Sequence, residues 1–156
     1  MIVAIGADHA GAPLHAAVVG ALEDLGHQIL DLGTRDDYPD IALAVGRAVA
    51  SGAAQRGVLS CGSGAGVGVA ASKIPGVRAQ TIHDAYTAHQ AVEHDDVNVL
   101  CLGARVVGEA IARELVAVFV TAQVSGEERH VRRRAKVDLL ERDGLDAVFA
   151  DTTTGE

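Results

Sequence analysis

Five short apolar runs recur along this chain, and their spacing limits the folds that it can adopt. The runs are rich in Val, Ile and Leu and lie at 2–6, 28–32, 57–60, 77–82 and 97–102. None of them alternates apolar with polar residues, which is typical of strands buried on both faces of a sheet. Segments with helical spacing of Ala, Leu and Val lie between them, near 12–25, 40–54, 66–73, 85–95 and 108–122. This alternation predicts an α/β fold with a parallel sheet sandwiched between helices.

A sixth helical segment, at about 127–142, breaks the alternation and is rich in arginine. Its polar character is suited to docking across a neighbouring subunit. We predict one domain over residues 1–143, because a chain of 156 residues can bury a core without disulfide or metal staples. Residues 144–156 show little pattern, so we expect a weakly structured C-terminal tail.

Composition excludes several classes of partner. A net charge of -8 and an aromatic content of 3% argue against a nucleic-acid surface. No apolar run is long enough to cross a bilayer, and the first residues carry no export signal, so we predict a cytoplasmic protein without a membrane partner. The two cysteines, Cys61 and Cys101, fit neither a disulfide framework nor a metal-ligand spacing. Cys101 lies within an apolar run and is interpreted as a core residue.

The loop after the third apolar run reads CGSGAG, from Cys61 to Gly66. Ligands of parallel sheets bind beyond the carboxyl ends of the strands, which is where this loop is predicted to lie. Its glycines allow backbone N–H groups to converge on an anion, and the following helix start favours a thiolate or oxyanion. Cys61 and Ser63 would then supply a base and a hydrogen-bond donor. A tight turn with a buried thiol is the alternative interpretation.

Commoner glycine-rich motifs do not fit this loop. A dinucleotide-binding fingerprint needs glycine where the chain has Val67, and an NTPase phosphate loop needs a Gly-Lys pair that is missing. The nucleophile elbow of the hydrolases needs glycine at the position of Cys61.

Two further clusters carry groups that can bind or transfer protons. Asp8 and His9 follow the first apolar run, where they could move protons or hold an anion, although Asp8 could equally cap the next helix. In RHVRRR, at 129–134, Arg129 and Arg133 share one helical face and suit a phosphate, while His130 and Arg134 share another. A solvated basic face is the alternative for this run.

Together these motifs resemble the ribose-5-phosphate isomerases of the B type, whose relatives include galactose-6-phosphate isomerase subunits. The similarity extends from residue 2 to about residue 137. It is carried by GADHAG at 6–11, DYPD at 37–40, CGSGAGVGVAASK at 61–73, EHDDVNVLCLGARVVG at 93–108 and RHVRRR at 129–134. The resemblance implies a Rossmann-like three-layer sandwich with a five-stranded parallel sheet, and catalysis without metal or cofactor. It also implies a homodimer, or a tetramer formed by two dimers, with active sites shared between subunits.

The resemblance further implies an aldose–ketose isomerisation through an enediolate. Cys61 matches the base of the branch that uses cysteine, and Val67 stands where the other branch has glutamate. Ser63 would help to hold the enediolate oxygen, His94 would assist opening of the sugar ring, and Asp8 would manage hydroxyl protons. The residues expected to contact substrate or phosphate are His9, Tyr38, Gly62, Gly64, Gly66, Asp95, Arg105, Arg129, His130 and Arg133.

One departure from the family pattern leaves the sugar open. Asp95 stands where Asn is usual, and an ionised carboxylate can only accept hydrogen bonds. Ribose 5-phosphate is therefore the first expectation, with allose, galactose and tetrose phosphates as alternatives. A module that only binds phosphosugars is the alternative from another functional class. A thiol-redox role lacks a second cysteine close in sequence to Cys61.

Overall fold

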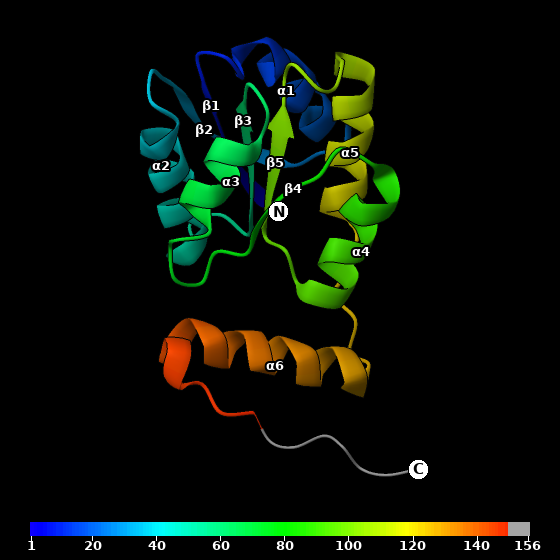
Figure 1. The fold of residues 1–156 in the computed structure, drawn as a ribbon. Helices are drawn as coiled ribbons and strands as arrows, with labels where there is room; N and C mark the ends of the chain where they lie inside the picture. The colour runs from blue at the N-terminus through cyan, green and yellow to red at the C-terminus, as the bar shows by residue number, and fades with distance from the viewer. Residues whose placement is uncertain (150–156) are drawn as a thin grey trace.

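A parallel five-stranded sheet forms the middle layer of the structure, a computed structural model that describes residues 1–149 (Figure 1). Its strands are β1 (Ile2–Asp8), β2 (Gln28–Arg35), β3 (Arg56–Cys61), β4 (Ala79–Thr81) and β5 (Val99–Gly103). They are arranged in the order β2-β1-β3-β5-β4, and every neighbouring pair is parallel. The predicted α/β class and the five-stranded parallel sheet are confirmed.

Helices cover both faces of this sheet and form two separate hydrophobic clusters with it. One cluster contains side chains of α1 (His15–Asp24), α4 (Ala85–Asp95) and α5 (Glu109–Thr121), and the other those of α2 (Tyr38–Ala50) and α3 (Ala65–Ala71). Strand residues alternate between the two: Leu100 and Leu102 of β5 join the first, while Val99 and Cys101 join the second. Because both faces of β1, β3 and β5 are buried, these strands have no polar alternation.

The observed boundaries differ from the predicted ones where local turn chemistry intervenes. The helix expected from residue 12 begins instead as a 3-10 turn, Ala12–Leu14, with Pro13 in it, and α1 starts at His15. The second helix starts at Tyr38, with Pro39 in its first turn, where proline's missing N–H costs nothing. Strand β1 continues past the predicted residue 6 to Asp8.

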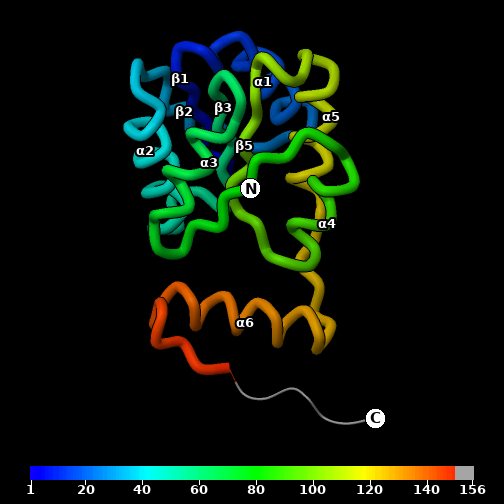
Figure 2. The backbone as a smooth tube through the Cα atoms, viewed as in Figure 1, coloured from blue at the N-terminus to red at the C-terminus, as the bar shows by residue number. Residues whose placement is uncertain are grey.

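The sixth helix, α6 (Glu128–Asp143), lies across the end of the sandwich where the strands begin (Figures 1 and 2). Its position along the chain matches the prediction, and its role in contacts between subunits stays a prediction. A 3-10 turn, Gly144–Asp146, follows it, and residues 147–149 have no regular structure. The rest of the predicted tail, residues 150–156, lies outside the described residues. Within residues 1–149, no helix has both the length and the apolar character to cross a membrane.

The strand order reverses direction between β1 and β3. The chain leaves β1 toward β2 on one side and returns to place β3 on the other, so the loops after β1 and β3 diverge at their carboxyl ends. Such a switch point is the usual ligand site of parallel sheets. Gly11 lets the loop after β1 lie close against the end of β3, because a Cβ there would collide with the backbone carbonyl of Ser60 and lie 2.6 Å from the amide nitrogen of Cys61.

We expect Gly11→Ala to lower the free energy of unfolding by about 1–3 kcal/mol, as overpacking against a rigid backbone does. Urea denaturation followed by circular dichroism measures this change. Gly126→Ala is the matched control, because a Cβ at Gly126 meets nothing within 4 Å. Equal stabilities of the two variants would contradict the close approach of the loops.

Candidate active site

The thiol of Cys61 lies at the carboxyl end of β3, beside the backbone of the glycine-rich loop. Cys61 is only 5% exposed, and its sulfur accepts a hydrogen bond from the N–H of Gly64 at 3.1 Å. Gly64 has φ +81°, the left-handed conformation that turns the chain from β3 into α3. An amide N–H directed at sulfur favours negative charge there. The side chain of Ser63 is exposed, and its Oγ accepts from the N–H of Ala65 at 3.3 Å.

Asp8 approaches the same loop from the end of β1. Its side chain is buried, and Oδ1 accepts a hydrogen bond from the N–H of Gly11 at 2.8 Å. This bond makes Asp8 a turn-forming residue as well as a candidate acid or base. His9 is exposed beside it, with Nδ1 3.1 Å from the carbonyl oxygen of Asp36 in the loop after β2.

Tyr38 and Arg105 complete the group at this edge of the sheet. A Cβ added at Gly66 would lie 3.2 Å from the ring of Tyr38, and one at Gly62 would lie 3.5 Å from the guanidinium of Arg105. The backbone N–H of Arg105 also donates to the carbonyl of Gly62 at 3.0 Å. We call this group the rim group: Asp8, His9, Tyr38, Cys61, Gly62, Ser63, Gly64, Gly66 and Arg105.

Two side chains that the sequence did not single out support the loop of the rim group. The hydroxyl of Thr81 donates to the carbonyl of Gly64 at 2.8 Å, and Nε2 of His83 accepts from the N–H of Gly103 at 2.9 Å. Both follow or end β4, which is the shortest strand. Because β4 lies next to β5, Thr81 and His83 reach the loop. Only the order of the strands in the sheet could have revealed these contacts.

The remaining predicted residues lie at the opposite end of the molecule. We call them the base group: His94, Asp95, Arg129, His130 and Arg133. His94 and Asp95 end α4, just before β5 begins, and the other three belong to α6. Strand β3 alone, with six residues, separates the two ends by about 17 Å at 3.3 Å per residue. The structure therefore does not bring the rim group and the base group together within one chain.

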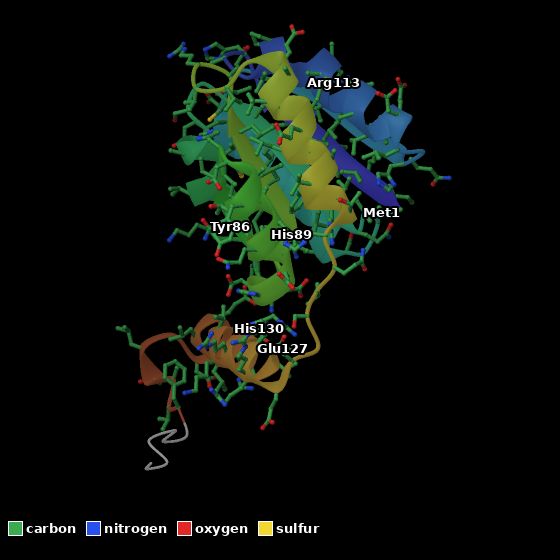
Figure 3. All side chains as sticks on the ribbon, turned by 90° about the vertical axis from the view of Figure 1, so that its right-hand side faces the viewer. Met1, Tyr86, His89, Arg113, Glu127 and His130 are labelled. Atoms are coloured by element: carbon green, nitrogen blue, oxygen red, sulfur yellow. The ribbon has the colours of Figure 1, made fainter. Side chains whose placement is uncertain are left out.

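Within the base group, two histidine rings stack on each other. The ring centroids of His94 and His130 are 3.9 Å apart, and their planes are inclined by 34°. His130 is buried, with 2% of its surface exposed, so it is not open to a ligand as the sequence interpretation expects. Burial, and then the neighbouring His94 and Arg129, hold the pKa of His130 below its usual value. Figure 3 shows His130 on α6 below the body of the protein.

The two arginines of α6 that are predicted to hold phosphate lie at its surface. Arg129 and Arg133 are exposed, and Arg129 forms an ion pair with Glu127, whose Oε2 lies 2.8 Å from Nε of the arginine. Asp95 is also exposed. It lines a cavity of about 750 Å³ that is bounded by α6, α4, β4 and the turn before β4.

The second cysteine belongs to the core. Cys101 is fully buried in β5, and burial, with Cys61 nearby, raises the pKa of its thiol far above the usual range. The core interpretation of Cys101 is therefore confirmed. Among residues 1–149, no group of three or more His, Cys, Asp or Glu side chains is placed to hold a metal ion.

The chain matches one family over nearly its whole length. The sequence model of the family described as Ribose/Galactose Isomerase matches residues 3–137. The ribose-5-phosphate isomerase B of Escherichia coli (strain K12) is 38% identical over 144 residues, which cover 90% of this chain and 96% of that protein. A D-erythrulose-4-phosphate isomerase of Pectobacterium atrosepticum is 36% identical over 129 residues, covering 80% and 85%.

Solved structures agree with the sequence comparison. The type B ribose 5-phosphate isomerase of Trypanosoma cruzi superposes with a TM-score of 0.88 at 40% identity, covering 92% of this chain and 99% of that one. A family match over most of the chain, close relatives and the same fold lead to one conclusion: this chain belongs to the ribose/galactose isomerase family.

Proposed function

We propose that the protein is an aldose–ketose isomerase that interconverts ribose 5-phosphate and ribulose 5-phosphate, with Cys61 as its base and without metal or cofactor. The observation that carries this proposal is the placement of the Cys61 sulfur, 3.1 Å from the Gly64 N–H and at the switch point beside Asp8. Isomerase relatives that act on phosphosugars support it. A cytoplasmic location is part of the same proposal.

The reaction needs a base, an oxyanion site and a proton carrier. The Cys61 thiolate removes the proton from C2 of the open-chain aldose, and the electron pair moves to the carbonyl oxygen to give an enediolate. Ser63 and the N–H groups of the loop at Gly62, Gly64 and Gly66 hold the developing negative charge, an arrangement whose single donors each contribute about 10² to 10³ in rate. Asp8 moves the hydroxyl proton between the two oxygens. The proton on sulfur then returns to C1, which leaves the carbonyl at C2.

The substrate also needs ring opening, which the base group supplies, and a phosphate grip, to which both groups contribute. His94 transfers the proton that opens the furanose ring, since the aldose arrives cyclic and its carbonyl must be freed. The phosphate is held by His9 and Arg105 together with Arg129 and Arg133, whose planar guanidinium groups fit phosphate oxygens in pairs. Tyr38 and Asp95 line the sugar site.

These roles require two copies of the chain. The rim group and the base group lie about 17 Å apart along β3, a distance longer than a pentose phosphate needs between its reacting carbons and its phosphate. A symmetric homodimer solves this problem if each site takes the rim group from one copy and the base group from the other. The exposed apolar side chains of α6, Val131, Val137 and Leu140, support burial of this helix against a partner.

Turnover of ribose 5-phosphate in the presence of a chelator tests the proposal directly. We expect purified protein to interconvert the pentose phosphates at about 1 to 10³ per second and to act more slowly on six-carbon and four-carbon phosphosugars. Chelator removes metal ions that could substitute for the proposed thiol chemistry. No turnover of any of these sugars would refute the proposed isomerase and favour a binding module.

A second candidate is the same reaction on a different sugar. Asp95 favours it, because this exposed carboxylate lines the cavity beside α6 and accepts hydrogen bonds without donating any. Preference for a six-carbon or four-carbon phosphosugar in the assay above would select this candidate.

We expect Cys61→Ala to abolish turnover while phosphosugar binding, measured by calorimetry, stays nearly unchanged. Loss of the base removes the proton-transfer step and leaves the phosphate contacts in place. Cys101→Ala is the matched control, because it removes a buried thiol from the adjacent strand; it should cost about 1 kcal/mol of stability and keep kcat. A Cys61→Ala variant within about tenfold of the parent kcat would refute the base assignment.

We expect Arg133→Ala to raise KM by about 10- to 100-fold with a smaller effect on kcat, as loss of one charged hydrogen-bonding partner does. Steady-state kinetics at low substrate measure the change. Arg132→Ala, at the exposed neighbouring position of α6, should leave KM unchanged.

Co-expression of the Cys61→Ala and Arg133→Ala chains then tests the shared site. In a mixed dimer, one site receives both substitutions and the other receives neither. At substrate concentrations well below the parent KM, where Arg133→Ala homodimers contribute little, random pairing should therefore restore about one quarter of the parent activity. Activity equal to the mean of the two variants would mean that each site is built from a single chain.

A further inference from the structure

One face of α6 contacts the rest of the chain through a histidine ring and three polar side chains. Residues 130, 134, 138 and 141 recur at helical spacing and form what we call the inner stripe. Asp138 accepts a hydrogen bond from Arg78 at 2.5 Å, and Glu141 accepts one from the N–H of Gly76 at 3.0 Å. His130 is the only side chain of α6 that is buried. The stripe therefore fixes where α6 sits by directed contacts rather than by an apolar core.

The first two members of the inner stripe both act on His94. His130 stacks its ring on the His94 ring at a centroid distance of 3.9 Å. Arg134 donates from Nη1 to the backbone carbonyl of His94 at 3.1 Å and from Nη2 to the carbonyl of Ser125 at 2.9 Å. The N–H of Ser125 in turn donates to the carbonyl of Glu93 at 2.8 Å. The ring and the backbone of His94 are thus both held from outside α4.

We infer that His130 and Arg134 are positioning residues that set the orientation of His94 and its distance from the phosphate-binding arginines. Arg129 and Arg133 each precede a member of the inner stripe by one residue, which turns them about 100° around the helix axis from it. One face of α6 therefore holds His94, and the neighbouring face carries Arg129 and Arg133. This inference rests on the proposed function, in which His94 opens the sugar ring.

The environment of His130 favours a packing role over a role in phosphate binding. Its Nδ1 is buried without a hydrogen-bond partner in the described part of the chain, and its surface is 2% exposed. Burial and the nearby His94 lower its pKa, which favours the uncharged ring. A neutral, enclosed imidazole offers its face to a neighbouring ring and provides no charge for a phosphate.

Comparison of His130→Ala with His130→Phe separates these roles. Phenylalanine keeps an aromatic face for stacking and removes both ring nitrogens. We expect His130→Ala to lower kcat by about ten- to a hundredfold with little change in KM, as misplacement of a catalytic group does, and His130→Phe to restore most of the loss. His89→Ala, an exposed histidine of α4 (Figure 3), is the control and should keep the parent kinetics. A similar rise of KM in both His130 variants would overturn the inference and make His130 a phosphate ligand.

A double-mutant cycle tests whether both residues act through His94. Arg134→Ala should lower kcat as well, and the double variant with His130→Ala should lose far less than the product of the two single losses. Strictly multiplicative losses would show that the two side chains act independently and would overturn the shared role.

A measurement without substrate keeps the inference testable apart from the proposed function. The ring protons of His94 should show a ring-current shift in NMR spectra of the parent and of His130→Phe, and lose it in His130→Ala. An unchanged His94 signal in His130→Ala would overturn the stacking itself. A parent protein that shows this shift but turns over no phosphosugar would refute the proposed function, and with it any role of His130 and Arg134 in catalysis.

Discussion

The contact between Gly11 and the end of β3 determines where the residues proposed for catalysis lie. Because Gly11 has no side chain, the loop after β1 lies against the backbone of Ser60 and Cys61. The bond from the Gly11 N–H to Asp8 fixes the same turn from the other side. Asp8 and Cys61 therefore end neighbouring strands at the switch point of the sheet, where the glycine-rich loop supplies N–H groups for the proposed chemistry. A larger residue at position 11 would move Asp8 away from Cys61 even without substrate.

The same sheet geometry explains why the proposed site needs more than one chain. All strands are parallel, so every residue at a carboxyl end belongs to one edge and every residue that precedes a strand belongs to the other. Cys61 ends β3, whereas His94 lies just before β5. No adjustment of loops can move one to the other through a sheet that is buried on both faces. A site that uses both residues therefore needs one edge of the sheet from each of two copies. A two-fold axis between the copies produces two such sites.

The sequence predicts the structure correctly where burial alone determines the order of apolar and polar residues. Strands β1, β3 and β5 are covered on both faces and produce unbroken apolar runs, so they were predictable, as was the placement of Asp8 and Cys61 at strand ends. Strands β2 and β4 were also predicted, although most of their residues are not buried. Prediction from the sequence was less successful where contacts depend on tertiary neighbours. The burial of His130 against His94 and the support of the loop by Thr81 and His83 follow from the sheet order and from how α6 docks. A helix as polar as α6 carries no apolar stripe that would reveal its inner face.

The polar attachment of α6 has a consequence for assembly. An ion pair at a solvated surface contributes about 0–1 kcal/mol and a hydrogen bond about 0.5–1.5 kcal/mol. The Arg78–Asp138 ion pair and the hydrogen bond from the Gly76 N–H to Glu141 alone therefore hold the helix weakly. A partner that covers the cavity beside α6 would exclude water from the same contacts and strengthen them, because the effective dielectric constant falls. Assembly would then place His94 in the site of the other copy and fix its orientation at the same time. In this arrangement an isolated chain lacks one half of its site. It also lacks the partner surface that would make its own half rigid.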